Sequence, residues 1–290
     1  MEAILRTTAE GASMQNSMTS LGKQIRMGRI FGKDGRALML AVNHGLYMGP
    51  IGGIQSVDTL VEESLSAGID SLTVNKGIAM QFGAQLAGQT SLILKVTSRT
   101  KYFGPYEQPT ATVDEAVRLG ADAVAIGLSL CDDREDDSLA LTAEYVREAD
   151  IIGMPTVAHS YPNGNRIDDA QRYGEDAVGY AVRAAQELGI DIIKTFWTGS
   201  AKTFEKIVRI GAPAKIVLSG GPKCETLEAC FDMTYQCIQA GASGITYGRN
   251  IWQSPYPVAV IRGLRAIIHD NSTVQEALEL ASDYAGVNLK

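Results

Sequence analysis

The chain has 290 residues, 45% hydrophobic and 20% charged, a composition typical of a folded globular protein and not of a disordered or fibrous one. Its formal net charge of −7 argues against a nucleic-acid partner or a basic membrane anchor. No apolar stretch reaches the roughly 18 residues of a membrane span, and the first residues lack a secretory pattern, so we expect a cytoplasmic protein with no membrane association.

Short apolar runs alternate with amphipathic segments along the chain, and most of these runs end in Gly, Asn, Thr or Ser. Runs of this length, rich in Val, Ile and Leu, are typical of strands that are buried on both faces of a sheet. We predict eight strands, over Ala37–Asn43, Ser71–Asn75, Leu92–Thr97, Ala123–Leu128, Thr156–Ser160, Ile192–Trp197, Ile216–Gly220 and Gly244–Gly248.

The segments between the strands have helical periodicity and stop at a glycine, as in Val57–Ala67, Asp168–Leu188 and Thr226–Ala240. Eight alternating strand–helix units predict an α/β fold of the (β/α)8 TIM barrel type. An open, doubly wound sheet for dinucleotide binding would need a G-x-G-x-x-G segment after the first strand, and the sequence there does not have this pattern.

We predict one domain over the whole chain, made of an N-terminal extension (1–36), the barrel (37–270) and a C-terminal helix (271–290). The extension is expected to hold an extra helix over Met14–Arg29, and the C-terminal segment a helix over Ser272–Tyr284. Extensions of this kind close the bottom of a barrel or join subunits.

Lys194 stands in the apolar run of the sixth predicted strand, where alternation puts Ile192 and Phe196 on the same face. Apolar neighbours surround the lysine whichever face points inward, and burial lowers the pKa of an amine because it disfavours the charged form. An uncharged amine attacks a ketone to give a Schiff base, which is the basis of aldol chemistry without a cofactor. The alternative is a structural lysine paired with a carboxylate on a neighbouring strand.

Two glycine-rich segments follow the last two predicted strands, Ser219-Gly220-Gly221 and Gly248-Arg249. Loops at these two places are the usual phosphate site of a TIM barrel, because glycine lets backbone N–H groups approach the anion. Arg249 adds a forked cationic donor. The segments are otherwise tight turns, but their position favours a phosphorylated substrate.

Three more polar residues stand at strand ends, each with two interpretations. Tyr161 relays protons or binds a substrate hydroxyl, or else it caps the barrel rim. His44 is a general base near neutrality or a polar group satisfied in the core. Lys95 neutralises substrate phosphate or lowers the pKa of Lys194 by like-charge repulsion. The three histidines are widely spaced and no carboxylate or cysteine cluster is present, so we expect no catalytic metal.

Six motifs, in order, resemble those of the archaeal-type class I aldolases. They are Asn43-His44-Gly45 with Gly49-Pro50, Asn75-Lys76-Gly77, Tyr161-Pro162-x-Gly164, Ile193-Lys194-Thr195, Ser219-Gly220-Gly221-Pro222-Lys223 and Gly248-Arg249-Asn250-Ile251-Trp252-Gln253. The family includes fructose-1,6-bisphosphate aldolase, 2-amino-3,7-dideoxy-D-threo-hept-6-ulosonate synthase and the thiolase that cleaves a phosphorylated pentanedione in autoinducer-2 breakdown.

The resemblance implies a TIM barrel in which Lys194 forms the Schiff base and Tyr161 is the acid/base beside the imine. It implies that the two glycine-rich loops hold the phosphate next to the substrate carbonyl. It also implies a homo-oligomer, a pentameric ring or a decamer of two such rings, and chemistry that requires no organic cofactor or metal.

Two positions depart from the family pattern. Asn43 stands where family members have an aspartate, and an amide cannot accept a proton, so Tyr161, His44 or a water molecule would take over that step. Asn163 stands where the family has an arginine that binds a distal phosphate, and Arg166 becomes the candidate substitute. Both changes remove charge at the far end of the substrate, which suggests a changed aldehyde partner.

We therefore predict a class I aldolase or transaldolase that acts on a phosphorylated ketose. One alternative is a thiolase-type acyltransferase that acts on a phosphorylated diketone, which would require coenzyme A. Another alternative is a non-catalytic barrel that binds phosphorylated sugars.

Overall fold

A closed barrel of parallel strands lies at the centre of the protein, in a computed structural model that describes residues 20–102 and 104–289. Around the barrel the strand order is β1, β2, β3, β6, β7, β8, β9 and β10, and β10 pairs with β1. The strands are β1 Ala37–Ala41, β2 Ser71–Val74, β3 Ser91–Lys95, β6 Ala123–Leu130, β7 Thr156–Pro162, β8 Ile192–Thr195, β9 Lys215–Ser219 and β10 Gly244–Tyr247. Two short strands, β4 Thr97–Ser98 and β5 Gln108–Pro109, form an antiparallel pair beside the barrel.

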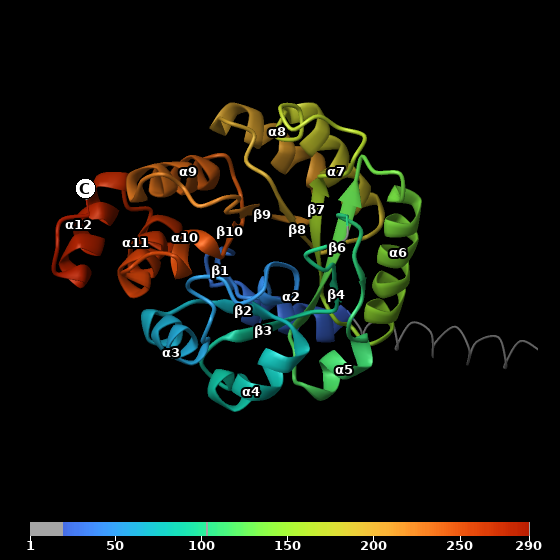
Figure 1. The fold of residues 1–290 in the computed structure, drawn as a ribbon, viewed down its shortest axis with the longest axis horizontal. Coiled ribbons are helices and arrows are strands. Elements are labelled where there is room, and N and C mark those ends of the chain that lie inside the picture. Colours follow the sequence, from blue (N-terminus) through green and yellow to red (C-terminus); the bar gives the residue numbers. More distant parts are fainter. Residues whose placement is uncertain (1–19, 103, 290) are drawn as a thin grey trace, which may run out of the picture.

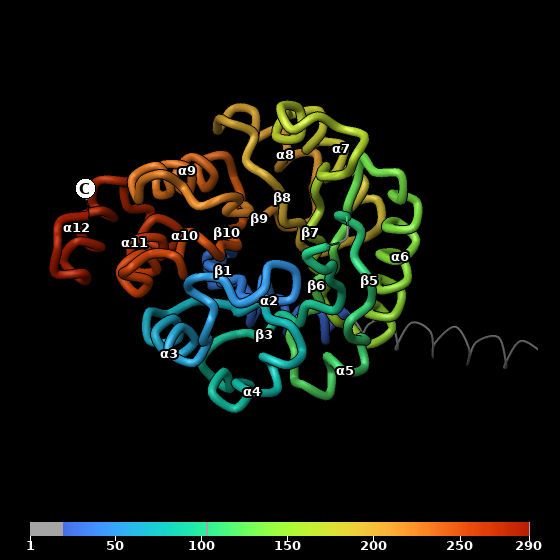
Figure 2. Tube along the Cα trace, viewed as in Figure 1, coloured from blue at the N-terminus to red at the C-terminus, as the bar shows by residue number. Residues whose placement is uncertain are grey.

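Helices surround the strands in chain order, so that Figures 1 and 2 show a ring of helices around the sheet. They are α2 Gly45–Met48, α3 Asp58–Ala67, α4 Lys76–Leu86, α5 Val113–Arg118, α6 Glu135–Ile151, α7 Glu175–Glu187, α8 Ala201–Gly211, α9 Leu227–Gln239, α10 Arg249–Trp252, α11 Pro257–His269 and α12 Val274–Ala285. The last of them, α12, packs against α9 and α11 (Figure 1). No helix among the described residues is long and apolar enough to cross a membrane.

The predicted TIM barrel is confirmed, and the differences are at the ends of elements. The helix predicted over Asp168–Leu188 begins only at Glu175, because Gly174 has an extended backbone (ψ 153°) and the residues before it form turns. The third strand stops at Lys95, and Thr97 belongs to the separate strand β4. The N-terminal helix spans residues 20–30 of the described chain, and the predicted part over 14–19 lies outside the described residues.

Alternate residues of each strand point into the barrel. The innermost layer is made of small and medium apolar side chains together with Ile30 and Phe31, which lie at the end of the N-terminal helix and close the bottom. Its strand members are Ala37, Met39, Ile93, Ala123, Ala125, Val157, Ile192 and Val217. The next inward positions of β3, β7 and β8, nearer the carboxyl ends, are Lys95, His159 and Lys194. The strand pattern therefore places three basic side chains in one layer above the apolar plug.

At the amino-terminal end of the barrel, aspartate side chains form hydrogen bonds with the backbone of neighbouring strands. Asp70, Asp122 and Asp191 each lie two residues after a helix-ending glycine whose φ is positive, and each precedes a strand. Their carboxylates accept backbone N–H groups of the neighbouring strands at N···O distances of 2.6, 3.3 and 2.9 Å. The repeated glycine-x-aspartate phrase thus ends a helix and fixes the next strand in register.

Candidate active site

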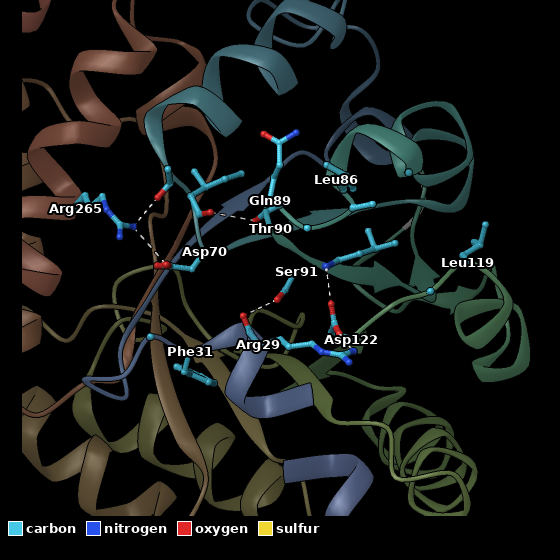
Figure 3. Close-up of a pocket in the computed structure, with 18 of the residues that line it drawn as sticks. Arg29, Phe31, Asp70, Leu86, Gln89, Thr90, Ser91, Leu119, Asp122 and Arg265 are labelled. Atoms are coloured by element: carbon cyan, nitrogen blue, oxygen red, sulfur yellow. Dashed lines mark hydrogen bonds and ion pairs between the residues drawn. The ribbon is translucent and has the colours of Figure 1, made fainter. Parts of the chain in front are cut away.

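Two cavities lie at the two ends of the barrel. The larger, about 870 Å³, is at the amino-terminal ends of β2, β3 and β6, and two of its cations, Arg29 and Arg265, are ion-paired with Asp122 and Asp70 (Figure 3). The smaller, about 270 Å³, is lined by residues from the carboxyl-terminal strand ends and contains Lys194. Catalytic groups of TIM barrels lie at the carboxyl-terminal face, whereas the opposite face serves stability, so we take the smaller cavity as the candidate active site.

Lys194 has the properties of a nucleophilic amine. It lies in β8, the residue is 6% exposed, and its Nζ forms no hydrogen bond or ion pair within residues 20–102 and 104–289. Burial lowers the pKa of the amine from 10.5 to about 7, and the nearby charges of Lys95 and Arg249 contribute to this lowering while Glu107 opposes it. A substantial fraction of this lysine is therefore uncharged at neutral pH.

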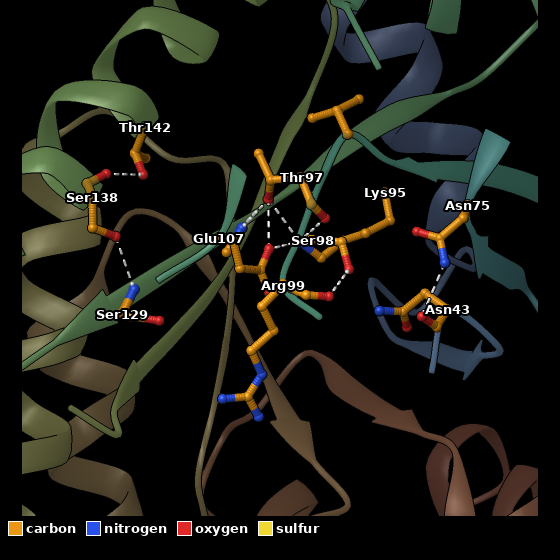
Figure 4. A network of polar contacts seen from close by, with 12 residues as sticks. Asn43, Asn75, Lys95, Thr97, Ser98, Arg99, Glu107, Ser129, Ser138 and Thr142 are labelled. Carbon is orange, nitrogen blue, oxygen red and sulfur yellow. Dashed lines mark hydrogen bonds and ion pairs between the residues drawn. The ribbon is translucent and has the colours of Figure 1, made fainter. Parts of the chain in front are cut away.

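Lys95 is held by a carboxylate that sequence analysis did not identify. Its buried Nζ contacts the Glu107 carboxylate and also donates to the backbone oxygen and hydroxyl of Thr97, each at 2.8 Å (Figure 4). Glu107 comes from the β4–β5 connection, and Gly127 of β6 makes room for it, because a Cβ on Gly127 would lie 2.0 Å from the carboxyl carbon. The charge of Lys95 is therefore already paired within the protein, and its expected role in binding substrate phosphate stays a prediction. Its charge contributes to the lowered pKa of Lys194.

Tyr161 and His159 lie on β7, the strand next to the one that holds Lys194. The Tyr161 hydroxyl donates to Ser219 Oγ at 3.1 Å, and its ring stacks on Phe196 with centroids 4.3 Å apart. Burial raises the pKa of Tyr161, so the hydroxyl keeps its proton and acts as a donor. His159 pairs in register with Lys194, and burial together with Lys194 and Lys95 keeps its pKa well below the ordinary value, so its imidazole is neutral.

The segment after β1 contributes Asn43 and His44 to the cavity. Burial first, then the charges of Lys194 and Arg249, lower the pKa of His44 to about 3. An imidazole with that pKa is a weak base at neutral pH, so the interpretation of His44 as a general base is not supported. His44 instead packs edge-on against Trp252, with ring centroids 5.3 Å apart. Gly248 is required beside it, since a Cβ there would lie 2.6 Å from His44 Cε1.

The two glycine-rich loops meet at one side of the cavity. Arg249 Nη2 donates to the Gly221 carbonyl at 2.7 Å, and Asn250 Nδ2 donates to the Gly220 carbonyl at 3.0 Å. Ser219, Gly220, Gly221, Gly248 and Arg249 all line the cavity, as the sequence predicted for a phosphate site. The left-handed backbone at Gly221 (φ +59°) makes the turn that brings these loops together.

Four buried polar atoms at this cavity have no hydrogen-bond partner within the described part of the chain. They are Asn43 Oδ1, His44 Nδ1, Asn163 Oδ1 and Arg249 Nε. Unpaired buried polar atoms are rare because each costs about 1–3 kcal/mol. Their concentration in one cavity indicates a site built for a polar ligand.

Arg166 lies outside the cavity, whereas Arg99, for which the sequence suggested no role, lines it. The Arg166 side chain is 70% exposed and ion-paired with Asp133, and its expected contact with substrate stays a prediction. Arg99, which sequence analysis passed over, does line the cavity, and its guanidinium carbon lies 5.3 Å from the centre of the Tyr47 ring. In Figure 4 this guanidinium extends away from the contacts between Lys95, Thr97 and Glu107.

No group of three or more His, Cys, Asp or Glu side chains suited to a metal ion is found in residues 20–102 and 104–289. Glu107 carries the one carboxylate among the described residues that line the cavity. The described cavity therefore offers an amine, hydroxyl groups, neutral imidazoles, two guanidinium groups and the carboxylate of Glu107, which is paired with Lys95.

Comparison with known proteins gives consistent similarities. Residues 37–254 match the family described as DeoC/LacD aldolases. The chain is 32% identical to 2-amino-3,7-dideoxy-D-threo-hept-6-ulosonate synthase of Halobacterium salinarum, covering 91% of this chain and 98% of that protein. It is 35% identical to the 3-hydroxy-5-phosphonooxypentane-2,4-dione thiolase of Escherichia coli, covering 89% and 86%. An archaeal fructose-1,6-bisphosphate aldolase, whose catalytic lysine is covalently bound to a carbinolamine intermediate, superposes with a TM-score of 0.78 at 30% identity, covering 85% and 99%.

Proposed function

Because the chain belongs to the DeoC/LacD family of aldolases, we propose that Lys194 cleaves or forms a carbon–carbon bond in a phosphorylated ketose through a Schiff base. The family and the class I aldolase activity agree with the resemblance found in the six sequence motifs. The single observation that carries the role of Lys194 is its buried amine, with a pKa of about 7, in a cavity shared with both glycine-rich loops.

The proposed reaction starts when the Lys194 amine attacks the ketone carbon and forms a carbinolamine. Loss of water gives an iminium ion, which withdraws electrons so that the C3–C4 bond breaks into an enamine and an aldehyde. Protonation and hydrolysis then release a phosphorylated ketone and free the lysine. Capture of the enamine by a second aldehyde would make the same site a transaldolase.

Proton transfer falls to Tyr161 in this proposal, because Asn43 cannot accept a proton. The Tyr161 hydroxyl is protonated in the free site, and the positive iminium beside it favours the phenolate by lowering its pKa. Ser219, which accepts a hydrogen bond from that hydroxyl, connects the tyrosine to the phosphate side of the cavity. The neutral imidazole of His159, in register with Lys194, supplies a second group able to pass protons during dehydration.

We assign phosphate binding to Ser219, Gly220, Gly221, Gly248 and Arg249. The support is that Arg249 presents an unpaired, buried Nε at the cavity while its Nη2 is anchored on the Gly221 carbonyl. An anion there would be fixed next to β8, because β9 and β8 are neighbours in the barrel. Fixing the phosphate orients the substrate carbonyl at Lys194, which contributes several kcal/mol to catalysis.

A retro-aldol screen of phosphorylated ketoses tests this function. The expected result is release of a triose phosphate from at least one ketose by the wild-type protein and not by the Lys194→Met variant. An Asn43→Asp variant run in parallel asks whether a carboxylate at that place raises cleavage of fructose 1,6-bisphosphate. Equal, metal-independent release by wild type and Lys194→Met would contradict the proposal.

A second candidate is acyl transfer from a phosphorylated diketone, favoured by the 35% identity to the thiolase of Escherichia coli. A further cavity of about 510 Å³ adjoins the glycine-rich loops and is lined by aromatic and apolar side chains such as Trp197 and Met233, where a second substrate with an apolar part would fit. Release of an acyl-coenzyme A from a phosphorylated pentanedione distinguishes this reaction, because borohydride trapping would mark Lys194 in both.

We also propose that the protein is cytoplasmic and works as a homo-oligomer, a pentamer or a decamer of two rings. The support is the resemblance of its motifs to a family that assembles in this way. Light scattering at several protein concentrations measures the mass of the particle, and a mass of 31.0 kDa, that of one chain, would contradict the proposal.

A further inference from the structure

The four cysteines of the chain are free thiols, and the proposed reaction uses none of them. Cys230 and Cys237 are buried in α9, whereas Cys224 and Cys131 are partly exposed. Cys224 lies between the Ser219–Gly221 loop and α9, and Cys131 follows β6. Cys224 also lines the cavity of about 510 Å³ beside the glycine-rich loops, so a small solute in that cavity can reach this residue.

Cys224 and Cys230 are hydrogen-bonded partners at the start of α9. The Cys230 thiol donates to the Cys224 sulfur, and this contact is the main cause that lowers the pKa of Cys224 below its ordinary value. Burial opposes this effect, and the Asn250 side chain adds to it. The pKa of Cys230 is raised, first by the contact with Cys224 and then by burial. Cys224 is therefore the thiolate of the pair, and Cys230 is the thiol beside it.

Cys131 provides an internal comparison. Its thiol is also partly exposed, but burial and the charge of Glu135 raise its pKa. Exposure alone therefore does not distinguish Cys224, whereas the neighbouring thiol does. A partly exposed thiolate in contact with a second cysteine is the arrangement of a redox-sensing pair, in which the first sulfur is oxidised and the second forms a disulfide with it.

The backbone of Cys224 belongs to the hydrogen bonds that hold the two glycine-rich loops together. Its N–H donates to Asn250 Oδ1 at 2.7 Å, and Asn250 Nδ2 donates to the Gly220 carbonyl at 3.0 Å. Asn250 is 6% exposed and directly follows Arg249, so one buried amide joins the segment of Cys224 to both loops. A covalent bond that draws Cys224 toward α9 would therefore displace the backbone to which we assign phosphate binding.

We propose that Cys224 is an oxidation site: a hydroperoxide converts it to a sulfenic acid, Cys230 converts the sulfenic acid to a disulfide, and the disulfide weakens phosphate binding by the glycine-rich loops. This last effect rests on the phosphate site of the proposed function. The Cys224 thiolate attacks the peroxide, the O–O bond breaks, and the released hydroxide takes a proton to form water. The Cys230 sulfur then attacks the sulfenic sulfur, and its proton leaves with the displaced hydroxide as water. With hydrogen peroxide, two thiols are oxidised to one disulfide and the peroxide is reduced to two waters.

Oxidation is tested with hydrogen peroxide at pH 7 and peptide mapping without reductant. Cleavage after Glu225 and Glu228 separates the two cysteines, so the disulfide appears as two joined peptides, which dithiothreitol releases. In Cys230→Ala the reaction should stop at the sulfenic acid, which dimedone labels on Cys224. Cys131→Ser is the matched control, because it removes the other partly exposed thiol and should form the same disulfide. Oxidation of Cys131 before Cys224, or a wild-type protein without the disulfide, would overturn the inference.

The effect on the loops is measured as the Kd for inorganic phosphate, by isothermal titration calorimetry of the reduced and the oxidised protein. We expect the Kd to rise about 3- to 10-fold on oxidation, as for the loss of one hydrogen bond, and to return to its first value with dithiothreitol. The same peroxide treatment should leave the Kd of Cys224→Ser unchanged. A disulfide that forms without a change in the Kd would contradict the coupling between the cysteine pair and the loops.

The outcomes separate this inference from the proposed function. Reduced protein incubated with dihydroxyacetone phosphate and then borohydride is labelled on Lys194 if the Schiff-base function is right, whether or not peroxide forms the disulfide. Labelled Lys194 together with intact thiols after peroxide treatment refutes the oxidation site only. Unlabelled Lys194 together with the Cys224–Cys230 disulfide and weaker phosphate binding refutes the aldolase function and supports the oxidation site.

Discussion

Replacing Gly127 with alanine should displace the Glu107 side chain at the wall of the active-site cavity. The added Cβ would be 2.0 Å from the Glu107 carboxyl carbon and 2.1 Å from one of its oxygens, well inside van der Waals contact. The Glu107 side chain is the flexible partner, so it must move and give up its bonds to Lys95 and to Thr97 Oγ1. Lys95 would then be a fully buried ammonium without a carboxylate.

The expected loss follows from the cost of breaking a buried ion pair, which is about 3–5 kcal/mol when one charge is left behind. Lys95 reduces this cost by releasing its proton, because burial already lowers its pKa. We therefore expect the free energy of unfolding to fall by about 2–4 kcal/mol. Gly83→Ala in α4 is the control: its Cβ meets nothing within 4 Å, and glycine-to-alanine in a helix is stabilising by up to about 1 kcal/mol.

Urea unfolding followed by circular dichroism measures both variants. The decisive comparison introduces Gly127→Ala into a Lys95→Met/Glu107→Ala background, where neither the obstructed carboxylate nor the buried charge is present. In that background Gly127→Ala should lower the free energy of unfolding by less than about 1 kcal/mol, because Gly127 is coupled to Lys95 and Glu107 only through their ion pair. An equal cost in both backgrounds would show that the strand backbone, and not Glu107, resists the methyl group.

Three further predictions concern catalysis. The kcat/KM for ketose cleavage should rise with pH and level off above pH 7, because Lys194 must lose a proton and its lowered pKa of about 7 sets the midpoint. Tyr161→Phe should lower kcat about 100-fold or more with little change in KM, as steady-state kinetics will show, because it removes the proton donor. Arg249→Met should raise KM for the phosphorylated ketose about 10- to 100-fold, because one charge-assisted contact is lost.

For each of these three predictions, one result would contradict the reasoning. A rate that keeps rising to about pH 10 would mean that Lys194 titrates as an ordinary lysine. A Tyr161→Phe variant within twofold of wild type would move the proton-transfer role to His159. An unchanged KM in Arg249→Met would place the substrate phosphate elsewhere in the barrel mouth.

The sequence was sufficient for the barrel because its information is local and repeated. Eight apolar runs and helix-ending glycines such as Gly68 and Gly189 specify alternating elements, and the handedness of the connections leaves few ways to arrange them. The strand end that holds Lys194 could be found for the same reason, since a lysine in an apolar strand needs an explanation.

The residues that were missed lie in connections between strands and helices, where the sequence has no hydrophobic periodicity from which structure can be predicted. Glu107 and Arg99 sit in the segment around the β4–β5 pair, and only the folded chain brings them to the barrel mouth. One signal was present: Gly127 interrupts the apolar run that forms β6, and a glycine inside a strand often marks the close approach of another group. The expected contact of Arg166 with substrate stays a prediction, because closeness along the chain to Tyr161 does not by itself bring Arg166 to the cavity.

The role of Lys194 as the nucleophile is tested most directly by trapping. The protein is incubated with dihydroxyacetone phosphate and reduced with sodium borohydride, and its peptides are mapped by mass spectrometry. We expect one covalent adduct, on Lys194, formed at neutral pH and absent from Lys194→Met. An unmodified Lys194, or labelling spread over exposed lysines such as Lys202, would contradict the account.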